Sequence, residues 1–511
     1  MEKIKGTDIT LVLSITVLTA LCDVLFYSFI DGKPLKSFLI LGSNYIMSLF
    51  LWSVLFIAKL IHLRNLLQIL AQLVVAIYFC LLVFCWYRFG APLDKSMIAL
   101  ITGTNNAEVR EFFHSYIAPL HLAVMTVSIV LLTILQVWIT HKNFQPSTNF
   151  IKALAVWTLV ACSGVGYSFY TLPGRLEGIL RTEQKDLNKY RQNPVMKETT
   201  TSHPDILMII IGESFARNHS SLYGYDKPTN PRLQQEANSG KLIIFKDPVA
   251  PATHTAEAFK YFMTTYDKQK TEKEWFKHLT LTEALQCAGY QTAWFSNQAQ
   301  AGWYDNISAA FAKMCKYICY PSTREDGELG ARPDGILLPK VKQYLSNQKP
   351  NIRLALFIHL MGQHNDFEQR YTQEFAHFQP TDYLHRLESQ RKNYATYDNA
   401  TLYNDYVVDS LFTMLKGKNA VAVYFSDHGM DFYESAPDYC SHANNSNPTS
   451  VHSGLMIPFF LYTTENYLMV HSTFIDRARQ TASKTFCTDN LPFLILDAIG
   501  YRVEGRKGYQ K

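Results

Sequence analysis

The chain has 511 residues, of which 48 are basic and 43 acidic, so its formal net charge at neutral pH is only +5. Hydrophobic residues make up 48% of the sequence and aromatic residues 14%, which excludes an intrinsically disordered protein. So small a net charge gives no electrostatic footprint for nucleic acid, and we expect no nucleic-acid partner. The charges are unevenly distributed: residues 1–172 carry 18 charged side chains, whereas the other 339 residues carry 73. This contrast predicts an apolar N-terminal part joined to a soluble part.

Five apolar runs in the N-terminal part are long enough to cross the roughly 30 Å of hydrocarbon in a membrane. They are Ile9–Ile30, Phe38–Ile61, Leu66–Tyr87, Tyr116–Thr140 and Phe150–Leu172. The first run has no small-residue cleavage site and four more runs follow it, so we interpret it as a retained span. Five spans place the two ends of the chain on opposite sides of the membrane. The distribution of Lys and Arg slightly favours an N-terminus on the cytoplasmic side.

Two connecting segments have distinct predicted roles. The loop Phe89–Ser115 is unusually long, and the helical spacing within Met97–Phe113 suits the membrane surface, where it would cover a lipid-binding site. Pro173 and Gly174 end the fifth apolar run, and a highly charged stretch and a polar run follow. Residues 173–204 are therefore predicted to form an amphipathic linker helix and a tether.

The soluble part, residues 205–511, alternates short buried runs with helical patterns. The predicted strands are Ile206–Gly212, Leu242–Phe245, Thr292–Ser296, Leu354–His359, Val421–Phe425 and Pro458–Tyr462. Helical spacing is found at Thr282–Ala288 and Tyr394–Leu415, among others. Buried strands that alternate with helices predict an α/β/α domain with a mostly parallel sheet.

Carboxylates and imidazoles follow the predicted strands at their carboxyl ends, where ligands gather in such sheets. Glu213 follows the first strand, Asp427 and His428 follow Val421–Phe425, and His364 follows Leu354–His359. Converging side chains of these types predict a metal site with oxygen and nitrogen ligands, most often zinc.

A candidate nucleophile lies in the segment Pro251–Met263, which reads as a polar loop running into a helix that starts near Thr255. A threonine hydroxyl at a helix N-terminus and beside a cation would be activated as an alkoxide, close to a favourable position for a phosphate. Threonine is also a good helix cap, and the spacing alone leaves both interpretations open.

The segment Ile211–Tyr225, which begins Ile-Gly-Glu-Ser and ends Leu-Tyr-Gly-Tyr, is followed by Pro-Thr-Asn-Pro at Pro228–Pro231. It resembles the opening signature of membrane-bound phosphoethanolamine transferases of the alkaline phosphatase-like superfamily, the group that includes the mobile colistin-resistance enzymes. Ala288–Gln298, Gly362–His364 and Ser426–Gly429 match the same pattern. That family has five N-terminal spans and a periplasmic catalytic domain, so the resemblance covers nearly the whole chain.

The resemblance implies a role for each matching residue. The catalytic zinc would be held by Glu213, Asp427, His428 and the nucleophile Thr255, with Thr253 as the nearby alternative nucleophile. Further matches concern the substrates: His364 and His442 would meet the phosphoryl group or a further zinc, with His452 as the alternative to His442, and Thr104 and Glu108 would hold the ethanolamine end of the donor lipid.

Three departures from the family pattern stand out. The acidic residue expected directly after Asp-His-Gly is Met430, although Asp431 is adjacent. Pro251 and Tyr261 occupy the places of cysteines that often bracket the nucleophile loop, and the asparagine expected one turn before Thr104 is Leu100. The sequence therefore matches the family more closely at the metal site than in the membrane loop.

The implied activity is transfer of phosphoethanolamine from phosphatidylethanolamine to a lipopolysaccharide acceptor, either lipid A or a core sugar, through a phosphothreonine intermediate. We expect a monomeric inner-membrane protein with its catalytic domain in the periplasm. A phosphoglycerol transferase of the lipoteichoic-acid synthase type and a non-catalytic membrane scaffold are the alternatives. The segment Arg217–Tyr225 favours phosphoethanolamine, and no Cys/Ser-x-Pro/Ala-x-Arg element for a sulfatase formylglycine is present.

Among the cysteines, Cys315 and Cys319 are the closest pair in the soluble part. A periplasmic location permits disulfides, so we expect a bond between these two residues.

Overall fold

The computed structural model describes residues 196–267, 274–298, 307–322, 332–443 and 447–503, together with Ala123, Thr126, Val127 and Val130, which are helical. Apart from these four positions, the five apolar runs lie outside the described residues, as do the charged stretch before Met196 and the predicted donor-binding residues Thr104 and Glu108. None of the helices within the described ranges is both long and apolar enough to span a membrane. The chain divides into two compact units, and nearly all described residues belong to the one containing Leu180–Lys511.

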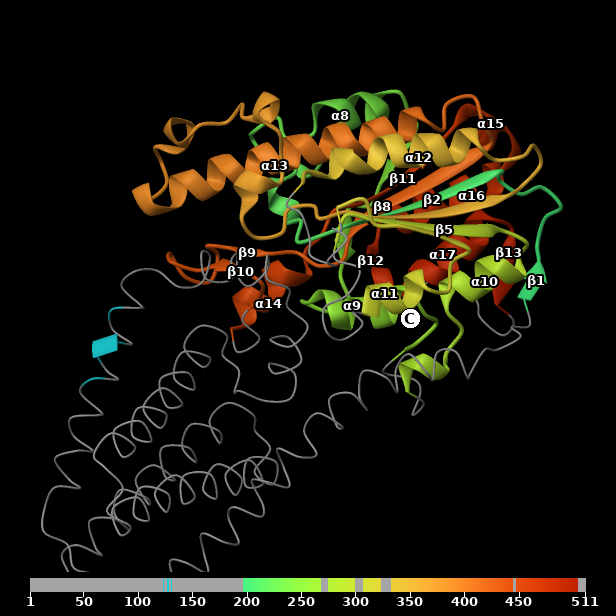
Figure 1. Ribbon diagram of the computed structural model, residues 1–511, viewed down its shortest axis with the longest axis horizontal. Helices are drawn as coiled ribbons and strands as arrows, with labels where there is room; N and C mark the ends of the chain where they lie inside the picture. Colours follow the sequence, from blue (N-terminus) through green and yellow to red (C-terminus); the bar gives the residue numbers. More distant parts are fainter. Residues whose placement is uncertain are drawn as a thin grey trace, which may run out of the picture. The chain divides into compact units, whose positions relative to one another are not determined.

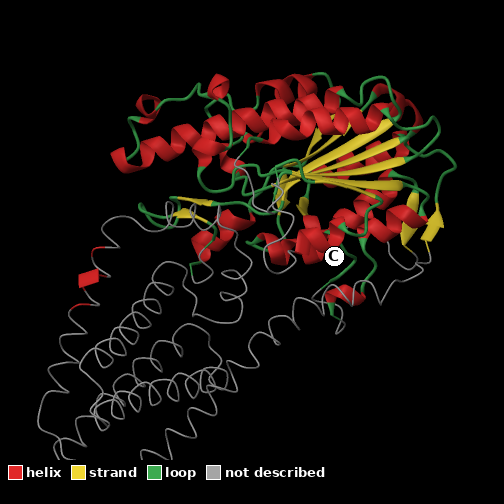
Figure 2. Ribbon diagram, viewed as in Figure 1, coloured by secondary structure: helices red, strands yellow, loops and turns green. Residues whose placement is uncertain are grey.

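A seven-stranded sheet runs through the middle of this unit (Figure 2). In spatial order its strands are β3 (Leu242–Ile244), β11 (Phe459–Thr463), β8 (Ala420–Ser426), β2 (Ile206–Gly212), β7 (Leu354–His359), β5 (Gln291–Ser296) and β6 (Tyr317–Cys319). The pairs from β8 to β6 are parallel, whereas β11 is antiparallel to both of its neighbours. The predicted α/β fold is confirmed, with a mixed sheet.

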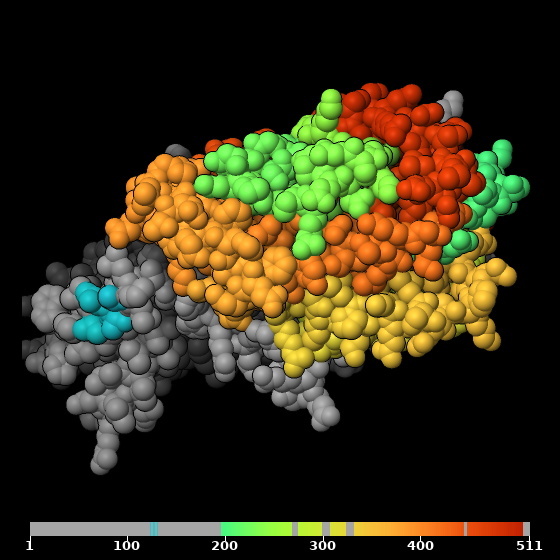
Figure 3. All heavy atoms as spheres, turned by 90° about the horizontal axis from the view of Figure 1, so that it is seen from above, coloured from blue at the N-terminus to red at the C-terminus, as the bar shows by residue number. Residues whose placement is uncertain are grey.

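Helices cover both faces of the sheet, which explains the continuous apolar runs of the central strands. Alternate residues of β2 face opposite cores: Leu207, Ile209 and Ile211 belong to one buried cluster, and Met208 and Ile210 to the other. The first core is covered by α9 (Thr255–Phe262), α10 (Leu281–Cys287), α11 (Ile307–Ala312), α16 (Ser472–Ala482) and α17 (Leu491–Ala498). The second is covered by α8 (Pro231–Asn238), α12 (Leu337–Ser346) and α13 (Glu388–Thr413), which lie over the sheet in Figure 1; Figure 3 views this side of the unit from outside.

Besides short 3₁₀ helices, the described residues also form three small sheets and two further helices. The sheets pair β1 (Met196–Glu198) with β13 (Tyr501–Val503), β4 (Asp247–Val249) with β12 (Thr485–Cys487), and β9 (Asp431–Phe432) with β10 (Cys440–Ser441). The helices are α14 (Pro448–Leu455) and α15 (Glu465–Val470). Because β1 pairs with β13, the last part of the predicted tether is a strand of the domain.

The expected disulfide between Cys315 and Cys319 is wrong: both cysteines are free. Cys315 is buried three residues after α11, and its Sγ lies 3.9 Å from the Phe311 carbonyl oxygen. Cys319 ends the extended strand β6. A strand advances about 3.3 Å per residue, so four residues of largely extended chain hold the two Cα atoms farther apart than a disulfide permits.

Candidate active site

Glu213 directly follows β2 and is buried at the carboxyl end of the sheet. Its Oε1 accepts a hydrogen bond from Ser214 Oγ at 2.8 Å, and its Oε2 accepts one from Gln298 Nε2 at 3.1 Å. Gly362 lies so close that a side chain there would meet the Glu213 backbone at 2.7 Å, and its φ of +52° also favours glycine. The loop after β7 therefore packs directly on the backbone of Glu213.

Asp427 and His428 follow β8, the strand beside β2, and both are buried. Asp427 Oδ1 accepts hydrogen bonds from the backbone N–H groups of Ser214 at 3.2 Å and His428 at 2.7 Å. His428 Nδ1 lies 2.7 Å from the Gly429 carbonyl oxygen, so this nitrogen carries the proton and donates it. Nε2 then faces Glu213 Oε1 at 3.3 Å and Asp427 Oδ2 at 3.5 Å.

Thr255 is the first residue of α9, which starts after a polar loop. Its Oγ1 lies 3.2 Å from both Glu213 Oε2 and His428 Nε2. The residue before it, His254, gives the helix no side-chain cap, so the first backbone N–H groups of α9 remain available to a ligand. The structure thus brings the four predicted zinc ligands together.

The two histidines predicted to meet substrate lie at the edge of this group. The ring of His442 is centred 4.9 Å from that of His428 and 5.8 Å from that of His364. His442 also stacks on His254, with ring centres 5.6 Å apart. Ligand atoms of Glu213, His428 and His442 all lie within 4.8 Å of one another, which makes His442 a further candidate metal ligand.

The ionisable side chains of this cluster shift one another's pKa values. Burial raises the pKa of Glu213, but the hydrogen bond and charge of His428 outweigh it and hold that pKa well below its usual range. Burial and the charge of Glu213 raise the pKa of Asp427 to about 7. Burial lowers the pKa of His428, but the two carboxylates raise it to about 9. Burial and the charge of His428 lower the pKa of His254 to about 4 and that of His442 well below its usual range, so these imidazoles are neutral near pH 7.

The donor atoms fit a zinc ion. Tetrahedral zinc with ligand distances of about 2.0–2.2 Å separates neighbouring ligand atoms by roughly 3.3–3.6 Å. The separations of Thr255 Oγ1, His428 Nε2 and the Glu213 carboxylate, from 3.2 to 3.4 Å, are close to this value. In addition, Asp427 Oδ2 is buried and receives no hydrogen bond from the described residues. A cation would satisfy this oxygen and balance the two carboxylates.

Other candidates from the sequence lie elsewhere. Thr253 Oγ1 pairs with His254 Nδ1 at 2.9 Å, and His452 is an exposed residue of α14. Asp431 is buried, but its carboxylate accepts hydrogen bonds from the backbone N–H groups of Glu434 and Ser435 and so holds a turn. Asp431 therefore does not take the place of the acidic residue that Met430 replaces.

Sequence reasoning missed three residues that shape the site. Gln298 donates to Glu213, and His254 stacks against His442 beside the candidate nucleophile. Asp334 accepts the backbone N–H groups of Met361 and Gly362 at 2.8 and 2.9 Å, and so fixes the loop that leads to His364. The adjacency of His254 to Thr255 was a visible signal, whereas the contact of Asp334 with a distant loop had none.

The fold and this cluster define the class: an alkaline phosphatase-like α/β domain with a candidate metal site at the carboxyl end of its sheet. Comparison with known proteins supports this. The Sulfatase family model matches residues 205–499. The chain is 26% identical over 472 residues to phosphoethanolamine transferase EptC of Escherichia coli (strain K12), covering 84% of this chain and 80% of that protein. It is 25% identical over 404 residues to phosphoethanolamine transferase EptA of Helicobacter pylori, covering 74% and 73%.

Solved structures agree. The C-terminal periplasmic domain of EptC from Escherichia coli, crystallised in complex with zinc, matches with a TM-score of 0.56 and 26% identity over 61% of this chain and 87% of that one. The integral membrane protein EptA from Neisseria meningitidis matches with a TM-score of 0.61 over 92% of this chain and 90% of that one; at 17% identity this likeness concerns the fold. The chain belongs to the sulfatase family, and its relatives confirm the resemblance to phosphoethanolamine transferases.

Proposed function

We propose that the chain transfers phosphoethanolamine from phosphatidylethanolamine to a lipopolysaccharide acceptor, with Thr255 as the nucleophile. One observation carries this proposal: the Thr255 hydroxyl lies 3.2 Å from both a buried carboxylate and Nε2 of a buried imidazole, at the start of a helix. The names of the two relatives described above, both phosphoethanolamine transferases, support the choice of transferred group.

In the first half of the reaction, Thr255 Oγ1 loses its proton and forms a bond to the phosphorus of the donor lipid. The bond from phosphorus to the diacylglycerol oxygen breaks, and that oxygen takes up a proton. The N–H groups at the start of α9 point to where the phosphoryl oxygens would lie and stabilise their negative charge. Phosphoethanolamine is then attached to Thr255 as an ester.

The proposed zinc ligands are Glu213, Asp427, His428 and Thr255, with His442 adjacent. A zinc ion bound there would lower the pKa of the threonine hydroxyl and offset charge on the phosphoryl group. His428 Nδ1–H donates to the Gly429 carbonyl, which leaves Nε2 as the nitrogen that would hold the metal. Gln298 keeps Glu213 in place by its hydrogen bond to Oε2.

In the second half, an acceptor oxygen attacks the phosphorus of the intermediate and Thr255 recovers its proton. His364 and His442 lie at the edge of the cluster, where they would contact the phosphoryl oxygens and the entering oxygen. Lipid A and a core sugar are both acceptors of the proposed class. Since one threonine serves both substrates in turn, the kinetics are expected to be ping-pong.

We also propose the membrane arrangement implied by the sequence: five spans, a catalytic domain in the periplasm, and donor headgroup contacts from Thr104 and Glu108. Donor and nucleophile would then meet at the membrane surface. The likeness of nearly the whole chain to the fold of an integral membrane protein supports this arrangement.

The decisive experiment compares Thr255→Ala with Thr253→Ala in the full chain, incubated with phosphatidylethanolamine. Wild type and Thr253→Ala should gain one phosphoethanolamine group in intact-protein mass spectrometry, because Thr253 pairs with His254 and does not contact the Glu213 carboxylate. Thr255→Ala should gain none, and its transfer rate should fall on the order of 10⁴-fold or more. An adduct on Thr255→Ala, with transfer intact, would contradict the proposal.

A further inference from the structure

A pocket outside the candidate active site, with a volume of about 660 Å³, lies beside the β9–β10 hairpin. We name it the tyrosine pocket, after Tyr225, Tyr383, Tyr394 and Tyr433 in its lining. Its walls come from the 3₁₀ turns at Arg217–His219 and Ser221–Tyr223, from α13 and the segment before it, and from the hairpin. None of the proposed zinc ligands lines it, so its chemistry needs a separate explanation.

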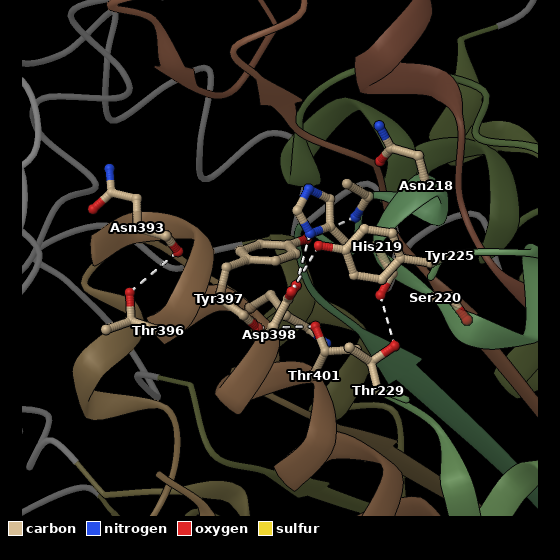
Figure 4. Close-up of polar contacts among 12 residues, drawn as sticks. Asn218, His219, Ser220, Tyr225, Thr229, Asn393, Thr396, Tyr397, Asp398 and Thr401 are labelled. Atoms are coloured by element: carbon tan, nitrogen blue, oxygen red, sulfur yellow. Dashed lines mark hydrogen bonds and ion pairs between the residues drawn. The ribbon is translucent and has the colours of Figure 1, made fainter. Parts of the chain in front are cut away.

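The floor of the tyrosine pocket is aromatic and rigidly held. His219 is buried, stacks on Tyr394 with ring centres 5.5 Å apart, and meets Phe432 edge-on at 4.4 Å. Its Nδ1 lies 2.8 Å from Asp398 Oδ1, as Figure 4 shows. The carboxylate thereby sets the tautomer, and Nε2 is the polar atom that His219 can offer to a ligand.

Both carboxylate oxygens of Asp398 accept hydrogen bonds from residues that line the pocket. Oδ2 accepts hydrogen bonds from the hydroxyls of Tyr225, at 2.7 Å, and Tyr383. Two tyrosine rings and one imidazole are therefore fixed around a single buried carboxylate, and the pocket is built before any ligand arrives. Such preorganisation lowers the entropy lost on binding.

The charges of the pocket exclude two classes of ligand. Asp226 and Glu434 balance Lys227 and Arg386 in the lining, so there is no excess of positive charge for a phosphate. Lys227 Nζ lies 5.3 Å above the Tyr383 ring and Arg386 Cζ lies 4.6 Å above the Tyr394 ring. The protein's own cations thus occupy those faces, which an ammonium ligand would need.

A sugar fits the remaining features. Each sugar hydroxyl is both a donor and an acceptor. The pocket offers Arg386 as a donor, His219 as an acceptor, and the pair in which Asn218 Nδ2 donates to Glu434 Oε1 at 2.6 Å, whose second amide hydrogen and remaining carboxylate lone pairs can bond to a ligand. The C–H faces of a sugar ring pack against aromatic side chains. We propose that the tyrosine pocket binds a sugar residue of the acceptor, an inference that rests on the proposed function.

The chain path connects this pocket to the nucleophile. His219 follows Glu213 by six residues, and Phe432 follows His428 by four, so the pocket floor lies at most roughly 20 Å from one ligand and 14 Å from the other. Tyr397 also links the two regions, because its hydroxyl accepts from the Ala216 N–H at 2.7 Å and donates to the Ser214 carbonyl at 2.8 Å. An oligosaccharide can therefore reach from the pocket toward Thr255.

Tyr433 carries a backbone strain that points to the same site. It is an aromatic residue with φ of +67°, in the left-handed region that tyrosine rarely adopts. Its hydroxyl accepts a hydrogen bond from Asn393 at 2.6 Å, and its ring stacks on Tyr394. Asparagine tolerates this backbone conformation, so Tyr433→Asn removes the aromatic face without adding strain.

The binding test uses the full chain in detergent and calorimetric titration with dephosphorylated lipopolysaccharide core oligosaccharide. Wild type should bind it, whereas Tyr433→Asn and the double variant Arg386→Ala/Glu434→Gln should bind at least about tenfold more weakly. Asp438→Asn, an exposed carboxylate in the same hairpin loop, is the matched control and should bind like wild type. Unchanged affinity in both pocket variants would overturn the inference. So would wild type that binds inorganic phosphate or ethanolamine in this pocket but no oligosaccharide.

A kinetic test separates this inference from the proposed function. Formation of the Thr255 adduct from the donor lipid should proceed in the pocket variants as in wild type, while the KM for the acceptor rises about tenfold. Absence of the adduct in wild type would refute the proposed function, and the oligosaccharide titration would still decide whether the pocket binds sugar. An unchanged acceptor KM with a normal adduct would refute the acceptor role of the pocket.

Discussion

A buried histidine–aspartate pair lies in each of the two sites, and the two pairs differ in how the carboxylate is satisfied. Asp398 accepts hydrogen bonds on both oxygens, from His219, Tyr225 and Tyr383. Asp427 accepts two backbone hydrogen bonds on Oδ1, and its buried Oδ2 accepts none among the described residues. A fully bonded carboxylate anchors structure, whereas a carboxylate with an open, buried lone pair suits a cation.

The elements that carry the two pairs explain the difference. Asp427 lies at a strand end, where the neighbouring groups are another carboxylate, Glu213, and the imidazole of His428. Asp398 lies within α13, facing side chains with hydroxyl and N–H donors. One site therefore concentrates negative charge and the other distributes it.

The largest effect is expected for Asp427→Asn. Loss of a charged ligand should abolish stoichiometric zinc, measured by mass spectrometry of the metal, and lower transfer on the order of 10³-fold. The zinc-free variant should be at least as stable as zinc-free wild type in urea, since a buried charge beside Glu213 is removed. Wild-type metal content in this variant would contradict a ligand role for Asp427.

Asp398→Asn should behave in the opposite way. The substitution disrupts the bonds to His219 and two tyrosines, so the free energy of unfolding should fall by about 3 kcal/mol. Zinc content should remain that of wild type, because Asp398 belongs to the tyrosine pocket. Urea denaturation together with metal analysis checks both statements, and loss of zinc from the folded variant would contradict the separation of the two sites.

The contrast also shows which parts of the molecule can be read from the sequence. The central strands β2, β7 and β8 are buried on both faces, and each appears in the sequence as an uninterrupted apolar run. The direction of β11 has no such signal, because a fully buried strand has the same composition whether it runs parallel or antiparallel. The short strand β6 is partly exposed and has no apolar run in the sequence. The sequence therefore gives no sign that the chain between Cys315 and Cys319 is extended, and the closeness of the two cysteines predicts a disulfide that the structure lacks.

The residues of the candidate active site also differ in how far the sequence predicts them. The sequence predicts Glu213, Asp427 and His428 because they lie just after strands whose ends are fixed by the sheet. The partnership of His219 with Asp398 joins positions 179 residues apart and depends on how α13 packs, which local patterns do not encode. The contact of Asp334 with the loop before His364 also joins distant positions of the chain, so local sequence patterns do not predict it.

The smallest effect tests how evenly the Asp398 network shares its energy. Tyr225→Phe removes the hydroxyl that donates to Asp398 Oδ2 at 2.7 Å, but Tyr383 continues to donate to the same oxygen. The buried carboxylate therefore never lacks a partner, and the free energy of unfolding should fall by only about 1 kcal/mol. Tyr406→Phe is the matched control: this tyrosine packs on Phe375 and under Arg232, away from Asp398, and the change should cost less than about 0.5 kcal/mol. A loss for Tyr225→Phe as large as that for Asp398→Asn would mean that this one hydroxyl carries the network, and that Tyr383 does not compensate for it.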